Sequence, residues 1–441
     1  MKLLSDKPKI IIVLSIWIFY IINILNYPLQ FQHDTWLHHF ELAKIMQFNF
    51  NDFKSEYGIP YYVFVSTFGI ITYPMYFFDI IGLKEGLYLT IKLSNIFLVL
   101  ITILIIIKFS EELISKKKDI IRFIPVLIFF ALAPTERVFL MCRPETIMIP
   151  LTLISTYYFR KLFVGINLTN KHLLIFIISS VFLGLQKSTG FLFIIGMFGF
   201  ALFFLKNLKN FPNYALTISF SIISYFFIHY ILTGIPFYEI EEVRRNQMNI
   251  TGFVNGNYSW EIFYKLNIIE TFKYPVRDTI SSIDRPFELS IPYIFLIDLF
   301  GDYFLYGKFR YLDRYTYFAC VHYLNKASIF ISLIFFISIF IISFKTFYTS
   351  IKIKNYNFNF FLNLQIYYGV FILSIATFLR MSPTGAVIKL DYIIFFLSLT
   401  CISFAEKLNN ISIIQKRIIF LLSLILCFYS VEPFKCGLLI S

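Results

Sequence analysis

The stretch LYLTIKLSNIFLVLITILIII, residues 87–107, decides the fold class because it is long and apolar enough to cross a membrane. A transmembrane helix needs about 20 predominantly apolar residues, and Lys92 is the single charged side chain of this run. Of the 441 residues in the whole chain, 58% are hydrophobic and 15% are charged. Soluble domains carry about 25% charged residues and could not bury so much apolar surface. The composition therefore excludes soluble, fibrous and disordered proteins and predicts an all-α polytopic membrane protein.

Runs of this kind predict about eleven transmembrane helices. The first run follows Lys2, Lys7 and Lys9, and no small-residue cleavage pattern comes after it. We therefore expect a retained first helix with a cytoplasmic N-terminus rather than a signal peptide. The predicted helices are residues 10–26, 87–107, 120–134, 144–159, 172–186, 190–205, 214–233, 328–344, 363–379, 391–404 and 418–430.

The distribution of charge supports this orientation. With the N-terminus inside, the short cytoplasmic segments carry about twice as many Lys and Arg residues as the short outer segments, which is the bias of inner loops. The net charge of +13 is then expected to face anionic lipid. We expect a multi-pass protein of the inner (plasma) membrane whose partner is the bilayer, and no nucleic-acid partner.

Residues 60–82 do not fit a simple count of crossings. They are apolar enough to span, but a crossing here would place Lys116–Lys118 on the outer side. We therefore expect an interfacial or re-entrant helical element, favoured by the internal prolines of the segment. The chain then divides into an N-terminal membrane module (1–233, with the first outer loop at 27–86), a large outer segment between the seventh and eighth helices (234–327) and C-terminal helices (328–441).

The five cysteines lie without CxxC spacing, so they indicate neither a disulfide framework nor a zinc site. We expect them to be packing residues. A bridge between Cys142 and Cys320 is the alternative, because both fall on the expected outer side.

The first outer segment begins with a polar cluster directly after the first predicted helix. In QHDTWLHHFELAK, residues 32–44, Asp34, His38 and Glu41 fall at i, i+4 and i+7 and would share one face of a helix. This cluster is a candidate for chemistry at the outer membrane surface. A polar surface helix capped by Asp34 and a metal site that lacks a fourth ligand are the alternatives.

Arg143 and Glu145 lie at the outer ends of the third and fourth predicted helices, and Pro144 between them suits a helix start. Ionisable groups at membrane depth are costly and usually face an interior cavity with a partner. The pair is therefore a candidate functional site, with a structural salt bridge as the alternative. Lys187 lies in the short hairpin GLQKSTG, residues 184–190, where snorkelling to the interface explains it equally well.

The order and common sidedness of these motifs resemble those of the GT-C superfamily of polytopic glycosyltransferases. Within that superfamily, the chain most resembles the bacterial branch that is similar to protein O-mannosyltransferases and aminoarabinose transferases. About the first 210 residues carry the resemblance, the last 60 resemble it loosely, and residues 234–327 match nothing in it. The motifs are Asp34, Glu56 to Tyr62, the basic cytoplasmic turn, Arg143-Pro144-Glu145, Gln186 to Gly190 and Lys389 to Tyr392.

The resemblance implies a GT-C-like fold and the transfer of a hexosyl or pentosyl group, with inversion, on the non-cytoplasmic side. The donor would be a polyprenyl-phosphate sugar and the acceptor a lipid, a glycan or a protein. It implies Asp34 as general base and Glu145 as a second acidic catalytic residue. The family often has paired acids where this chain has His33-Asp34-Thr35. We therefore expect chemistry that uses a single carboxylate, without metal ligands and without a cofactor. A divalent metal is the alternative.

A departing prenyl phosphate needs fixed cations in a poorly solvated site. The candidates for this phosphate contact are Arg143, Lys187, Arg380 and Lys389. The family's Lys or His before its Pro-rich stretch is replaced here by Glu56-Tyr57-Gly58, which leaves that part of the phosphate contact unassigned. Further substrate contacts are expected from His38, Glu41, Tyr61, Arg244 and Arg245.

Two other classes remain open. One is a transporter or flippase of lipid-linked sugars, although the chain lacks the duplicated halves that are typical of transporters. The other is an O-antigen polymerase or ligase, in which the chemistry would lie in the large outer segment. The charged residues between Asp298 and Arg314 keep that second class open, and a folded cap with surface salt bridges explains them as well.

Overall fold

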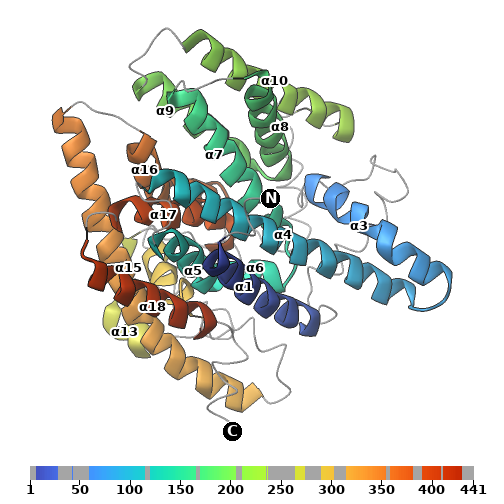
Figure 1. Cartoon of the computed structure of the whole chain (residues 1–441), viewed down its shortest axis with the longest axis horizontal. Coiled ribbons are helices and arrows are strands. Elements are labelled where there is room, and N and C mark those ends of the chain that lie inside the picture. The colour runs from blue at the N-terminus through green and yellow to red at the C-terminus, as the bar shows by residue number, and fades with distance from the viewer. Residues whose placement is uncertain are drawn as a thin grey trace. The chain divides into compact units, whose positions relative to one another are not determined.

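In the computed structural model of the chain, all regular elements among the described residues are helices (Figure 1). The described residues are 6–27, 42, 59–114, 120–164, 169–204, 211–234, 236, 264–273, 290–301, 314–353, 358–380, 390–408 and 411–429. The chain forms two compact units, residues 1–109 with 138–240 and residues 110–137 with 241–441. Residues 110–137, which the sequence assigned to the N-terminal module, thus belong to the second unit.

The first unit is organised around α8, which packs against α3, α7, α9 and α10. In the same unit, α3 and α4 form an antiparallel pair. Phe64 of α3 stacks on Phe97 of α4, with ring centroids 6.3 Å apart, and the hydroxyls of Thr72 and Thr90 are hydrogen-bonded. The described helices of this unit are α1 (Lys7–Asn26), α3 (Ile59–Phe77), α4 (Leu83–Leu113), α7 (Met148–Val164), α8 (Asn170–Gln186), α9 (Ser188–Phe204) and α10 (Phe211–Thr233), and the 3-10 turn η5 (Pro144–Ile147) precedes α7.

The second unit packs α17 and α18 against α5. A buried ion pair links α6 to α14 there, because Arg137 donates from both terminal nitrogens to the Asp298 carboxylate at 2.8 and 2.7 Å. The elements are η4 (Ile120–Phe123), α5 (Ile124–Ala131), α6 (Ala133–Leu140, shared with the first unit), α13 (Ile268–Lys273), α14 (Ile291–Asp298), α15 (Arg314–Ile353), α16 (Phe358–Arg380), η9 (Leu390–Ile393), α17 (Ile394–Lys407) and α18 (Ile413–Tyr429).

Ten of the eleven predicted runs lie inside a helix, or inside a 3-10 turn that continues into one, and none of the ten extends more than one residue beyond that element. The exception is 120–134, which we expected to be one helix. Instead α5 ends at Ala131, α6 begins at Ala133, and the two are bent by 67°. Pro134 explains the break, because its ring and its missing N–H do not allow α5 to continue through it.

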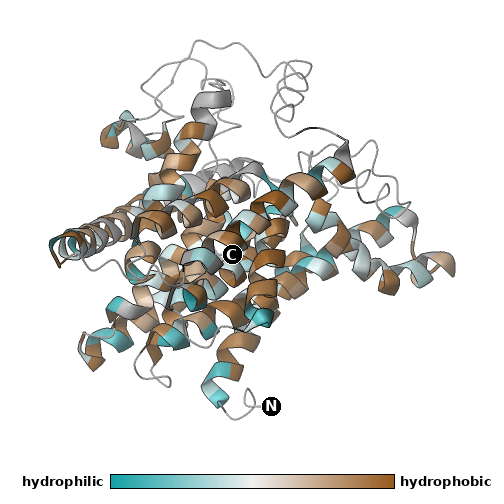
Figure 2. Cartoon of the chain, turned by 90° about the horizontal axis from the view of Figure 1, so that it is seen from above, coloured by the Kyte–Doolittle hydropathy of each residue, from teal (hydrophilic) through white to brown (hydrophobic). Residues whose placement is uncertain are grey.

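Among the described residues, three helices are long and apolar enough to cross a membrane, or up to four if the bent pair counts as one span. The three are Lys7–Asn26, Lys84–Leu113 and Phe358–Ile375. Several shorter apolar helices accompany them, and Figure 2 shows the described helices coloured as hydrophobic over much of their length. The described part of the chain is thus all-helical, with helices able to span a membrane, and the full count of eleven crossings stays a prediction.

Two segments depart from the regular scheme of spans. Residues 59–77 form one continuous helix, α3, in which Pro74 is accommodated close to the C-terminal end. The helix α15 begins at Arg314, 14 residues before the predicted start, and has 40 residues. At about 1.5 Å per residue it is roughly 60 Å long, twice the roughly 30 Å of a hydrocarbon core. Part of the expected outer segment is therefore continuous helix.

Candidate functional site

The local fold around Arg143 begins with a strained turn. Cys142 follows α6 with a φ of 50°, in the left-handed region that non-glycine residues rarely adopt. The backbone N–H of Arg143 then donates to the Val138 carbonyl at 3.0 Å, and Pro144 opens η5 with its fixed φ. This turn places Arg143 five residues and Glu145 three residues before Met148, where α7 begins.

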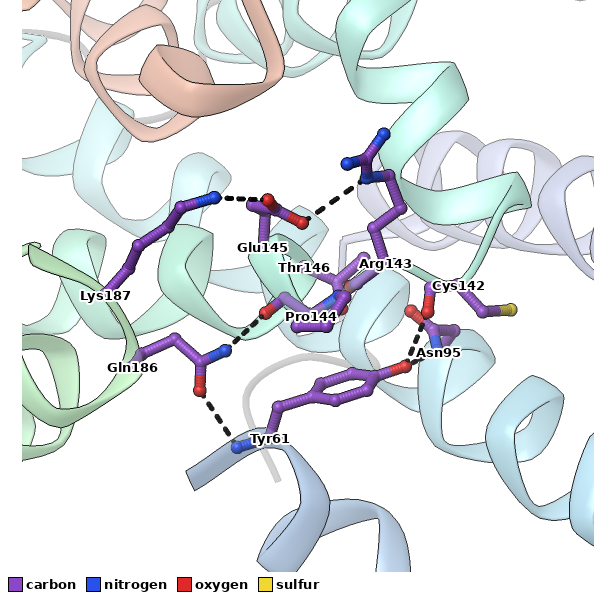
Figure 3. Close-up of polar contacts among 9 residues, drawn as sticks. All are labelled: Tyr61, Asn95, Cys142, Arg143, Pro144, Glu145, Thr146, Gln186 and Lys187. Atoms are coloured by element: carbon purple, nitrogen blue, oxygen red, sulfur yellow. Dashed lines mark hydrogen bonds and ion pairs between the residues drawn. The ribbon is translucent and has the colours of Figure 1, made fainter. Parts of the chain in front are cut away.

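Glu145 lies between two cations (Figure 3). Its Oε1 accepts a hydrogen bond from Lys187 Nζ at 2.6 Å, and its Oε2 lies 3.5 Å from Arg143 Nε. The side chains of Glu145, Arg143 and Lys187 are only 5%, 7% and 13% exposed. Removing charges from water costs several kcal/mol per ion, so the cluster depends on these mutual contacts. Both cations thus contact the same carboxylate in a nearly dry environment.

Gln186 links three elements of the cluster. Its Nε2 donates to the Pro144 carbonyl at 3.0 Å, and its Oε1 accepts from the Tyr61 backbone N–H at 3.0 Å. Gln186 is the last residue of α8, and Lys187 is extended between α8 and α9. Because the hairpin holds Lys187 directly after Gln186, the amide that ties η5 to α3 also fixes the backbone that carries the cation.

Tyr61 and Asn95 form the other side of the site (Figure 3). The Tyr61 hydroxyl donates to the Cys142 carbonyl at 2.8 Å and accepts from Asn95 Nδ2 at 3.0 Å. Asn95 is fully buried, and among the described residues its Oδ1 has no hydrogen-bond donor. An unsatisfied buried acceptor costs about 1–3 kcal/mol, a cost that the packing around Asn95 must offset.

Four of the sequence-predicted site residues therefore meet: Tyr61, Arg143, Glu145 and Lys187. Arg380 is the last residue of α16, and its side chain lies outside the described residues. Six others lie outside the described residues altogether: Asp34, His38, Glu41, Arg244, Arg245 and Lys389.

Two contributing residues were not predicted as site residues, Asn95 and Gln186. Asn95 had a usable signal, since a lone amide inside the apolar run 87–107 is expensive unless it meets a partner. Gln186 belongs to the motif of residues 186–190, but its contact with Tyr61 joins positions 125 residues apart. No local sequence pattern reports such a contact.

Cysteine and metal chemistry have no observed basis in the described part of the chain. No group of three His, Cys, Asp or Glu side chains there is arranged to hold a metal ion. Cys142 is a free, buried thiol, which removes the alternative of a bridge to Cys320. Burial raises the pKa of the Cys142 thiol to about 12, so it stays protonated at neutral pH.

No protein family model, no curated protein and no solved structure matches this chain. The described residues define an all-helical protein with membrane-compatible helices and a buried Arg–Glu–Lys cluster that two amides and a tyrosine hold in place.

Proposed function

We propose that the chain is a membrane glycosyltransferase that moves a sugar from a polyprenyl-phosphate donor to an acceptor hydroxyl or amine on the non-cytoplasmic side. One observation supports this most strongly. Tyr61, Arg143-Pro144-Glu145 and Gln186-Lys187, which belong to separate motifs of the GT-C resemblance, are joined by hydrogen bonds and ion pairs in one buried cluster.

In this proposal Arg143 and Lys187 bind the phosphate of the donor. The acceptor oxygen or nitrogen attacks the anomeric carbon, and the bond from that carbon to the phosphate oxygen breaks. The electron pair stays on the phosphate, where fixed cations in a poorly solvated site stabilise the developing charge. The proton of the acceptor passes to the Asp34 carboxylate, which acts as general base.

Glu145 has a positioning role in this scheme, which differs from the catalytic role that the family resemblance implies for it. Two cations contact its carboxylate, and opposite charges at this distance favour the ionised form of an acid. Such a carboxylate is a weak base, because accepting a proton would break both ion pairs. It is well suited to hold Arg143 and Lys187 at a fixed separation.

The test compares cells that lack the gene with cells that express either the natural chain or Asp34→Asn. Mass spectrometry of surface glycans and of lipid-linked sugars is the measurement. We expect one glycosyl modification to depend on the natural chain, and Asp34→Asn, expressed at equal level, to lose it while the lipid-linked donor accumulates. Normal modification by Asp34→Asn would refute the mechanism. A change only in the leaflet distribution of the lipid-linked sugar would instead identify a flippase.

A further inference from the structure

A second charged region lies at the opposite end of the α7–α8 hairpin from the Arg143–Glu145–Lys187 cluster. Lys161 follows Glu145 by 16 residues, which at about 1.5 Å per residue places it roughly 24 Å further along the helix axis. That distance approaches the roughly 30 Å of a hydrocarbon core. The basic residues of this end are Lys108 from α4, Arg160 and Lys161 from α7, and Lys171 from α8.

Two of these lysines converge on one aromatic ring. Lys108 Nζ lies 5.2 Å and Lys161 Nζ 4.9 Å from the ring centroid of Tyr157, so the two ammonium groups are at most about 10 Å apart. The ring is buried and packed edge-on against Phe109, with centroids 5.7 Å apart. Each cation is attracted to the ring, but the two cations repel each other. An anion that contacts both would offset that repulsion.

A second aromatic ring connects this pair to the start of α8. Lys161 Nζ lies 5.9 Å from the Tyr158 ring centroid, and the Tyr158 and His172 rings are 5.5 Å apart. Tyrosines beside lysines are typical of the boundary between hydrocarbon and headgroups, where the ring is in apolar surroundings and its polar end is in water. Lys171, next to His172, is exposed.

An exposed apolar stripe runs along α8 from Lys171. Leu174, Ile178 and Phe182 follow it at i+3, i+7 and i+11, on one face of the helix, and are 56%, 45% and 44% exposed. The stripe is about 16 Å long at 1.5 Å per residue, close to half of a hydrocarbon core of about 30 Å. A cation at one end of an exposed apolar stripe with the length of one leaflet matches the shape and charge of a phospholipid.

We propose that Lys108, Lys161 and Lys171 form a binding site for the headgroup phosphate of an anionic phospholipid, with an acyl chain along Leu174, Ile178 and Phe182. The charge selects an anionic headgroup, and the stripe selects a lipid over a free anion. This site does not depend on the proposed glycosyl transfer, because it lies at the other end of the hairpin from the residues that carry that proposal.

The experiment is native mass spectrometry of the full-length chain released from nanodiscs that contain equal amounts of phosphatidylglycerol and phosphatidylcholine. We expect selective retention of phosphatidylglycerol. The triple variant Lys108→Gln, Lys161→Gln, Lys171→Gln should lose that retention, by about fivefold for each charge removed. The matched control is Lys84→Gln, Lys345→Gln, Lys352→Gln, which removes three exposed lysines elsewhere and should keep it.

A third variant separates the lipid from a free anion. Ile178→Ser leaves all charges in place, so reduced retention of phosphatidylglycerol would support the acyl contact. Equal retention of the two lipids by the natural chain, or equal loss in the triple variant and its control, would overturn the proposal. Displacement of the lipid by inorganic phosphate with no effect of Ile178→Ser would instead indicate a free-anion site. If the triple variant fails to fold, the single exposed change Lys171→Gln decides the question.

Discussion

At the scale of single residues, the charge of Glu145 is the feature that can be tested most directly. Glu145→Gln keeps the shape of the side chain but leaves Arg143 and Lys187 close together without their shared anion. Breaking a buried ion pair by removing one partner costs about 3–5 kcal/mol. We therefore expect a clear fall in the thermal unfolding temperature of the purified protein, measured by intrinsic fluorescence.

Two further variants show whether this loss comes from the cluster. Glu85→Gln removes an exposed carboxylate at the start of α4 and should leave the unfolding temperature almost unchanged. Adding Lys187→Met to Glu145→Gln removes one of the two cations that contact position 145 and should recover part of the loss. Equal unfolding temperatures for Glu145→Gln and the natural chain would mean that the cluster is solvated and does not have the dry character on which the phosphate contact depends.

Cys142 is the second residue whose effect can be isolated. Its φ of 50° costs an L-residue about 1–2 kcal/mol, and glycine avoids that cost. Cys142→Gly and Cys142→Ala both remove the sulfur, so they differ mainly in backbone strain. We expect Cys142→Gly to unfold at the higher temperature in the same fluorescence assay. The reverse order would show that the turn before Arg143 is not strained.

At the scale of elements, the α8–α9 hairpin determines where Lys187 lies. A Cβ added at Gly190 would come within 2.2 Å of the Leu183 backbone carbonyl, whereas one added at Gly199 would meet nothing within 4 Å. Both glycines lie in α9, which makes them a matched pair. We expect Gly190→Ala to lower the unfolding temperature and Gly199→Ala to leave it equal or raise it, since Ala exceeds Gly in helix propensity by about 1 kcal/mol. Similar effects from both would exclude a tight hairpin.

Helix positions were predictable from the sequence because a single local property, the length of an apolar run, specifies them. The run 87–107 lies wholly inside α4. The break between α5 and α6 was also signalled, by Pro134, although the prediction did not use it. The early start of α15 at Arg314 was not visible, because residues 314–327 mix charges with aromatic residues and lack a long apolar run.

The candidate site was only partly predictable, for a different reason. Charged residues in apolar surroundings identified Arg143, Glu145 and Lys187, since burial of charge demands a partner. The sequence did not show that Glu145 lies between both cations, because that depends on how η5 and the α8–α9 hairpin pack. The tyrosine and amide bonds of Tyr61, Asn95 and Gln186 are likewise products of tertiary packing.

At the scale of the whole molecule, the orientation in the membrane decides on which side each of the two charged regions lies. Helix α4 offers the most direct test, because it is one of the three helices able to cross and carries exposed lysines near both ends, Lys84 and Lys108. These residues are about 36 Å apart at 1.5 Å per residue, more than a hydrocarbon core of about 30 Å. If α4 crosses, they must lie on opposite sides.

We expect a membrane-impermeant maleimide to label Lys84→Cys in intact cells and Lys108→Cys only after permeabilisation, each in a background without the native cysteines. This follows from the predicted cytoplasmic N-terminus, which places Lys108 inside with the other basic cytoplasmic segments. A reversed result would invert α4 and contradict the predicted placement of the inner lysines. Labelling of both positions in intact cells would mean that α4 does not cross, and the predicted alternation of sides after the first helix would then be wrong.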